Sequence, residues 1–254
     1  MTNTFELASN LACALDPSRF ATSRLGFVPD EWQIQAMRST SKCILLNCCR
    51  QSGKSTTTAI IALHTAIFKP GSLVLLVSPS LRQSRELFVK VTNFLKELSQ
   101  KPKLDEDNKL SITLANRSRV VSLPSSPETI RGFSAVDLLI EDEAAFCEDD
   151  LYRSVRPMLA VSNGQLILMS TPYGKLGHFF EEWTNGGDEW ERIKVTAHEC
   201  PRITKEFLEK ERTSLGSLWF NQEYMGIFAE RIDSVFSHDS VMTALSSEVQ
   251  PLFL

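Results

Sequence analysis

The sequence predicts an α/β fold in which a mostly parallel sheet is flanked by helices. Three continuous apolar runs, at residues 43–46, 138–140 and 166–169, are typical of strands buried on both faces, and each runs directly into polar residues. In open sheets of this kind, ligands bind outside the carboxyl ends of the strands. We therefore expect the three polar segments to meet at one edge of the sheet.

The first apolar run opens a strand, loop and helix pattern at residues 42–56 (KCILLNCCRQSGKST). The loop closes on Gly53, Lys54 and Ser55, just before an apolar-periodic segment that predicts a helix reaching to about Phe68. The loop N–H groups and the helix dipole favour an anion at one point. Lys54 would reach the β and γ phosphates of a nucleotide, and the Ser55 hydroxyl would hold Mg²⁺.

This phosphate-loop pattern has one departure, because a glycine is expected five positions before Gly53 and the chain has Cys48. Gly-Lys-Ser or Gly-Lys-Thr alone arises by chance in roughly one chain of this length in ten. The alternative interpretation is a helix-starting turn with a solvated lysine. A second nucleotide-site element is needed to decide between the two.

That second element lies at residues 137–143 (DLLIEDE), where a predicted buried strand runs out into three acids. Packing alone does not favour this pattern, because unpaired carboxylates are costly to bury. Asp142 would bind Mg²⁺ directly or through water, and Glu143 would activate the attacking water as general base. Glu141 is expected to point away, since strand residues alternate faces. The alternative is a strand end solvated at the surface.

The third strand ends in Ser170, Thr171 and Pro172. The two hydroxyls are placed to sense the γ-phosphate of a nucleotide or the attacking water. The alternative is a cap for the helix that starts near Gly177, and the two roles are compatible.

Gln33 lies at a predicted helix start, after Pro29 and two acidic residues. Its side-chain amide carries both donor and acceptor atoms, which suits the edge of an adenine. The alternative is a solvated glutamine on a surface helix.

The rest of the first 130 residues supplies ordinary scaffold patterns. Residues 1–26 are expected to pack on the outside of the domain, and residues 73–77 predict a further buried strand. Ser80 and Gln83 form a capping pattern for the next helix. Two further assignments are a charged surface loop at residues 101–108 and a β-hairpin with strands at 111–114 and 120–123.

The composition is that of one large globular domain, or of one domain with a small appendage: 254 residues, 43% hydrophobic and 23% charged. A net charge of −4 does not favour nucleic-acid binding over the whole surface, although a local basic patch is compatible with it. No apolar run reaches membrane-spanning length, and the N-terminus lacks the features of a signal peptide. Six cysteines without a C-x-x-C pair, and four histidines, favour reduced thiols in a cytosolic protein over a zinc site.

With these motifs in place, the chain resembles the ATPase domain of the tailed-phage terminase large subunit, the motor that packs viral DNA into the procapsid. The resemblance covers nearly the whole chain. In that family the missing loop glycine is usual, and so is an arginine four positions before the lysine, here Arg50. The segments that carry the resemblance are residues 32–33, 49–55, 78–84, 130–133, 137–146, 170–172 and 220–224.

The resemblance implies a RecA-like additional-strand P-loop ATPase fold that uses ATP and Mg²⁺. It implies an ATPase core at residues 1–200 and a small helical linker subdomain at residues 201–254, with helices at 205–213 and 217–224. The nuclease domain of the family is expected to be absent from this chain, because only 18 residues follow Phe236.

The resemblance also implies partners. These are double-stranded DNA, the portal protein and the small terminase subunit. The working form would be a homo-oligomeric ring on the procapsid, in the cytoplasm of the infected bacterial host, with no membrane involved. The isolated domain is expected to be a monomer.

Two arginines are candidates to stabilise charge on the transferring phosphoryl group. Arg50 would act within its own subunit, and its alternative is an ion pair with a loop carboxylate. Arg131 resembles an arginine proposed in similar terminases to reach the neighbouring subunit's ATP; its alternative, a pair with Asp137 or Glu128, carries equal weight. The predicted site comprises the nucleotide contacts Gln33, Arg50, Gln51, Ser52, Gly53, Lys54, Ser55, Thr56 and Thr171, the catalytic residues Lys54, Glu143, Arg50 and Arg131, and the metal ligands Ser55 and Asp142.

Two other functions share these motifs. A helicase, or another DNA-dependent P-loop ATPase, is one alternative, but a helicase needs a second RecA-like domain for which this length leaves no room. A nucleotide-binding switch without turnover is the other, and Glu143 beside Asp142 argues against it, because a slow switch tends to lack a catalytic carboxylate.

Overall fold

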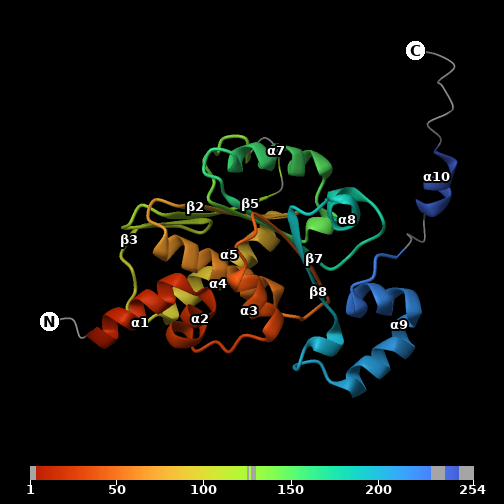
Figure 1. The fold of residues 1–254 in the computed structure, drawn as a ribbon, viewed down its shortest axis with the longest axis horizontal. Helices are drawn as coiled ribbons and strands as arrows, with labels where there is room; N and C mark the ends of the chain where they lie inside the picture. Colours follow the sequence, from red (N-terminus) through yellow and green to blue (C-terminus); the bar gives the residue numbers. More distant parts are fainter. Residues whose placement is uncertain (1–3, 125, 127–129, 230–237, 246–254) are drawn as a thin grey trace, which may run out of the picture.

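The computed structural model describes residues 4–124, 126, 130–229 and 238–245 and has an eight-stranded sheet at its centre (Figure 1). The strand order is β3-β4-β5-β2-β6-β7-β1-β8, and the six strands from β5 to β8 in this order run parallel. The strands are β1 Cys43–Cys48, β2 Leu73–Ser78, β3 Leu104–Asp107, β4 Ser111–Leu114, β5 Arg119–Pro124, β6 Leu138–Asp142, β7 Gln165–Ser170 and β8 Trp190–Val195.

Helices cover both faces of this sheet (Figure 1). One face carries the helices of the first hundred residues and the larger apolar core, and the other carries α7, α8 and a second core. The helices are α1 Thr4–Leu15, α2 Pro17–Leu25, α3 Glu31–Arg38, α4 Lys54–Phe68, α5 Leu81–Glu97, α7 Asp149–Leu159, α8 Gly177–Asn185, α9 Lys205–Met225 and α10 His238–Ala244. None of the helices in the described part of the chain is long and apolar enough to cross a membrane.

The order of the central strands confirms the predicted fold class. Strand β7 lies between β1, which leads into the predicted phosphate loop, and β6, which carries the acids. This is the additional strand of the predicted fold. Because β1, β7 and β6 are parallel neighbours, their carboxyl ends lie at the same edge of the sheet. In register, Asn47 pairs with Ser170, and Asp142 pairs with Met169.

The helix starts follow from local sequence chemistry. Helix α4 begins at Lys54 and ends at Phe68, as its apolar pattern predicted. Helix α5 begins after Ser80, whose hydroxyl accepts a hydrogen bond from the Gln83 amide at 3.3 Å. Helix α3 begins after Asp30 with a capping box that includes Gln33.

Strand β3, at the edge of the sheet, differs from the sequence prediction. Residues 101–108, predicted as a surface loop, contain the four-residue strand β3, which pairs antiparallel with β4. All four β3 residues are exposed, and their sequence (LDED) lacks the apolar alternation that marks a half-buried strand. Backbone pairing with the confirmed β4–β5 hairpin holds β3 in place, so the side chains carry no signal of the strand.

Helix α9 is attached to the larger core. Gly216, with φ 73° and ψ 168°, breaks it into two segments, in agreement with the two helices predicted there. Leu208, Phe220 and Tyr224 are buried in the same cluster as α3 and α4. A domain division at residue 200 therefore stays a prediction, and residues 230–237 and 246–254 of the predicted linker lie outside the described residues.

The turn before β7 provides a test of this packing. A Cβ atom at Gly164 would clash with the carbonyl oxygen of Val136 and lie 2.8 Å from Cδ2 of Leu159. Gly164→Ala is expected to lower the free energy of unfolding by about 1–3 kcal/mol, as overpacking does, measured by urea denaturation. Gly132→Ala is the matched control, because nothing lies within 4 Å of a Cβ there. Equal stability of the two variants would contradict the close approach at Gly164.

Candidate active site

The loop after β1 has the backbone of an anion-binding turn. Gln51 and Gly53 adopt left-handed conformations, with φ 62° and 98°, and Gly53 precedes the first residue of α4. Alternating backbone conformations of this kind turn successive N–H groups toward one concavity. The loop therefore places backbone donors and a helix N-terminus at one point, without the glycine that is replaced by Cys48.

The Lys54 side chain crosses from α4 to the end of β6. Its Nζ atom lies 2.8 Å from Oε1 of Glu143, and the two side chains are 12% and 24% exposed. Burial alone would lower the pKa of Lys54, but the charges of Glu143 and Asp142 outweigh it and raise that pKa. Lys54 is therefore a buried, charged donor held between two carboxylates.

Asp142 is the most buried of the site carboxylates, with 7% exposure. Burial raises its pKa to about 6, while the neighbouring Lys54 acts in the opposite direction. The Glu143 amide donates to Oδ1 of Asp142 at 3.0 Å. Glu143 itself has φ 55°, a left-handed backbone that is uncommon for a residue of this type and is typical of functional sites.

The end of β7 adds hydroxyl groups to the same place. The Ser170 hydroxyl lies 2.7 Å from the carbonyl oxygen of Thr171 and 3.3 Å from Oε2 of Glu143. Thr171 is 5% exposed and lines the cavity beside Glu143. The three polar strand ends therefore meet, as the sequence predicted, although Ser170 rather than Thr171 makes the contact with Glu143.

Lys54, Glu143 and Thr171 line a cavity of about 480 Å³, whereas Asp142, Ser170 and Gln33 are not among its lining residues. It contains most of the predicted site, namely residues 50–56, Glu143 and Thr171. It also contains residues that the sequence reasoning missed: Lys90, Phe146, Arg202 and Glu223. Phe146 lies three residues after Glu143 and stacks on Tyr173 at 4.4 Å, so its position close to the acidic motif was a usable signal. The other three reach the cavity from α5 and from the region beyond residue 200.

The two candidate arginines occupy different surroundings. Arg50 lies in the cavity, where its Nε atom pairs with the Glu223 carboxylate at 2.6 Å, so its partner belongs to helix α9 and not to a loop. Arg131 is exposed and does not line this cavity. The alternative of a pair between Arg131 and Asp137 is not formed, because Asp137 binds Lys69 at 2.6 Å. Glu128 lies outside the described residues.

Gln33 is buried, with 1% exposure, so it is not the solvated surface residue of the alternative interpretation. Its Oε1 atom accepts the Asp30 amide at 2.8 Å. Its Nε2 atom lies 2.9 Å from the position of a Cβ at Gly53. Gln33 is therefore packed against the phosphate loop, with its amide nitrogen directed at Gly53.

Oxygen donors at the site suit Mg²⁺. Asp142 supplies a buried carboxylate, and Ser55 supplies a hydroxyl at the second position of α4. Within the described residues no group of three or more Asp, Glu, His or Cys side chains is arranged to bind a metal ion. Mg²⁺ is commonly held by one or two protein oxygens together with phosphates and water.

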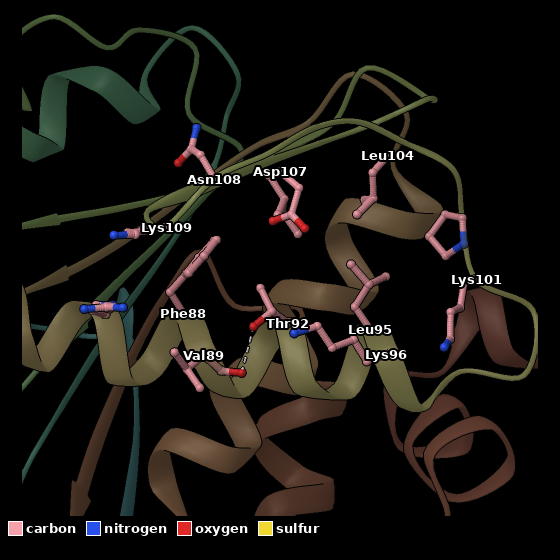
Figure 2. A pocket seen from close by; sticks show the side chains of 13 residues that line it. Phe88, Val89, Thr92, Leu95, Lys96, Lys101, Leu104, Asp107, Asn108 and Lys109 are labelled. Atoms are coloured by element: carbon pink, nitrogen blue, oxygen red, sulfur yellow. Dashed lines mark hydrogen bonds between the residues drawn. The ribbon is translucent and has the colours of Figure 1, made fainter.

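A second cavity, of about 310 Å³, lies between α5 and the β3–β4 hairpin (Figure 2). Its lining combines apolar side chains with lysines at the rim, and it contains none of the strand-end acids or the P-loop lysine. The labelled side chains include Phe88, Leu95, Leu104, Lys101 and Lys109 (Figure 2). It is therefore separate from the candidate active site.

Glu141 points to the opposite face of the sheet, as strand alternation predicted. It is fully buried, and its Oε1 atom lies 3.0 Å from Nε2 of His178 on α8. Burial would lower the pKa of His178, but the hydrogen bond and charge of Glu141 outweigh it, so the pKa is raised. The ring of His178 also stacks on Tyr152 at 4.8 Å. Glu141 therefore joins the acidic strand to α7 and α8.

The parallel sheet, its additional strand and the Gly-Lys-Ser helix start define the chain as a RecA-like P-loop domain. The family described as "Terminase large subunit, T4likevirus-type, N-terminal" matches residues 45–241. The chain therefore belongs to this family of terminase large subunits.

Individual relatives agree with this assignment. The terminase large subunits of Thermus phage G20c and Thermus virus P23-45 are each 26% identical to the chain over 271 aligned residues, covering 92% of it. The chain spans about half the length (56%) of these curated relatives.

Solved structures share the fold. The Thermus phage P74-26 large terminase ATPase domain has a TM-score of 0.75 and 24% identity, and the match covers 85% of this chain and 100% of that one. A large terminase from a thermophilic bacteriophage, in complex with ADP, has a TM-score of 0.65 and 12% identity, over 79% of this chain and 54% of that one.

The Lys54 ammonium group is the first test of the site. Lys54→Ala is expected to abolish nucleotide binding while leaving the fold intact, because it removes the charge-assisted contact to phosphate. Binding of a fluorescent ATP analogue, with circular dichroism as the folding check, measures this. Lys210→Ala, which removes an exposed lysine from α9, is the matched control. Undiminished binding by a folded Lys54→Ala chain would remove the P-loop interpretation.

Proposed function

We propose that this chain hydrolyses ATP with Mg²⁺ and that hydrolysis drives double-stranded viral DNA into a procapsid. The observation that carries the proposal is the ion pair between Lys54 and Glu143, with Asp142 beside it, at the mouth of a phosphate loop. A binding switch needs the lysine but has no use for a second carboxylate at the γ-phosphate end. Steady-state ATP hydrolysis, measured with and without DNA, tests the proposal.

The geometry supports a role for each residue. Phosphates in the cavity would replace Glu143 as the partner of Lys54, so that the Glu143 carboxylate would be released to accept a proton from the attacking water. Ser55 and Asp142 would hold Mg²⁺, which when bound neutralises phosphate charge and orients the nucleotide. Ser170 would keep Glu143 oriented through the 3.3 Å contact, and Thr171 would respond to the γ-phosphate.

The partners follow from family membership. We propose that the chain acts on double-stranded DNA together with the portal protein and the small terminase subunit, as a homo-oligomeric ring in the cytoplasm of the infected host. The two arginines fit an assembly of this kind. Arg50 already lies in its own cavity but is neutralised by Glu223, whereas the exposed Arg131 is free of the cavity of its own chain.

Substitutions of the two site acids should separate their roles. Glu143→Gln is expected to bind ATP with Mg²⁺ but to hydrolyse it about a hundredfold more slowly, the effect of losing a general base. Asp142→Asn should instead weaken the dependence of binding on Mg²⁺. Rates and ATP affinities measured over a Mg²⁺ titration distinguish the two. Altered metal affinity in Glu143→Gln with none in Asp142→Asn would mean that the roles are reversed.

Arg131 is expected to act on the ATP of a neighbouring subunit. Activity per molecule should therefore rise with protein concentration, because subunits must associate to supply the arginine. An arginine supplied in trans raises the rate about 10³–10⁵-fold in related phosphoryl transfers. Arg131→Ala should be nearly inactive alone. Mixing it with Glu143→Gln should restore activity, because the first variant supplies an intact site and the second supplies the arginine.

Steady-state hydrolysis across a concentration series, alone and in 1:1 mixtures, measures this effect. A second mixture combines Arg131→Ala with Lys54→Ala and should also restore activity, since Lys54→Ala likewise has an intact Arg131. Activity independent of concentration, with no rescue in any mixture, would leave Arg131 without a role in trans and favour Arg50.

A further inference from the structure

Arg202 is a side chain from outside the predicted motifs that reaches the phosphate loop. It lies between the short helix Ala197–Glu199 and helix α9. Its Nη2 atom donates to the carbonyl oxygen of Ser52 at 2.8 Å. Its side chain is 48% exposed and lines the same cavity as Lys54 and Glu143. The C-terminal region therefore contributes a guanidinium group to the nucleotide cavity.

The plane of this guanidinium is fixed by Asp30. Nη1 and Nη2 donate to the two carboxylate oxygens of Asp30 at 3.2 and 2.7 Å, a bidentate arrangement that fixes orientation as well as position. Asp30 is the N-cap residue of α3, and its amide is bonded to Gln33. One residue therefore orients both the Arg202 plane and the Gln33 side chain.

Arg202 and Gln33 converge on Gly53. A Cβ atom there would lie 2.9 Å from Nε2 of Gln33 and 3.6 Å from Nη2 of Arg202. Strand order places this convergence on a different side of β1 from the catalytic acids, because α3 packs against β8 whereas β6 lies beyond β7. Arg202 lines the cavity, whereas the buried Gln33 does not, so a nucleotide with its terminal phosphates at Lys54 and Glu143 would extend its base toward Arg202.

The charges of Arg202 and Lys54, at the two ends of the cavity, agree with this orientation of the nucleotide. Asp30 neutralises Arg202, so this residue offers the flat face of a guanidinium and little net charge. Lys54, by contrast, lies where phosphate charge would accumulate. A guanidinium plane fixed at its edge stacks well on an aromatic ring.

We infer that Arg202 is a nucleobase-contacting residue, whose guanidinium stacks on the face of the purine. This inference rests on the proposed function, because it requires a nucleotide in the cavity. Its consequence is that the segment leading into α9 contacts the base directly. Occupancy of the site by a nucleotide is thereby linked to the position of helix α9.

The test compares ATP with inorganic tripolyphosphate, which has the phosphates but no base. Dissociation constants for both ligands, with Mg²⁺, are measured by calorimetry for the wild-type chain, Arg202→Ala and Arg202→Lys. Arg202→Ala should weaken ATP binding about tenfold, the scale of a partly exposed stacking contact, and leave tripolyphosphate binding unchanged. Arg202→Lys keeps the charge near Asp30 but lacks the plane, and should behave like Arg202→Ala.

A control and three contrary outcomes make the test decisive. Arg212→Ala, which removes an exposed arginine of α9, should bind both ligands as the wild type does. Equal weakening of ATP and tripolyphosphate by both Arg202 variants would make Arg202 a brace or a phosphate contact and overturn the inference. Unchanged ATP binding would overturn it as well. A wild-type chain that binds neither ligand would instead overturn the proposed function, and the inference with it.

Discussion

The buried charge of Lys54 is the constraint on which the rest of the site depends. Burial of a lysine that is 12% exposed acts to lower its pKa, because burial disfavours the charged form, and nearby carboxylates are needed to offset that effect. Glu143 and Asp142 provide that compensation only because β6 ends beside the start of α4. The single strand β7 between β1 and β6 fixes this separation, and it also brings Ser170 to Glu143. The order of the strands in the sheet therefore determines whether Lys54 can be buried in its charged form.

The phosphate loop is also held from the C-terminal side of the chain. The Arg50 amide donates to the carbonyl oxygen of Glu223 at 3.0 Å, and the Arg50 side chain pairs with the Glu223 carboxylate. Asn47, at the end of β1, donates to the carbonyl oxygen of Gly226 at 3.0 Å. These polar contacts join the phosphate loop to the end of α9 and the glycine that follows it, whether or not residues 201–254 form a separate subdomain.

The predictable parts of this structure are those with local signals. Continuous apolar runs identified β1, β6 and β7, and their polar ends identified Lys54, Glu143 and Thr171, which line the cavity. Alternation along β6 placed Glu141 on the face away from Asp142. The parts that were missed depend on distant contacts or on the backbone. Arg202 reaches Ser52 across 150 residues of sequence, and nothing near Arg202 resembles a nucleotide motif. Strand β3 is defined by backbone pairing, with side chains typical of a loop.

Three consecutive acids in β6 and the turn after it illustrate how far a sequence pattern constrains chemistry. Glu141 is turned to α8, where His178 is its partner in a fully buried site. Asp142 is turned to the phosphate loop, where burial raises its pKa. Glu143, in a left-handed conformation past the strand end, reaches Lys54. The pleat of the strand directs Glu141 and Asp142 to opposite faces of the sheet. The left-handed turn at Glu143 gives its side chain a third direction. Three successive carboxylates thus supply a structural contact, a metal ligand candidate and a general base candidate, because each step along the backbone changes the surroundings of the side chain.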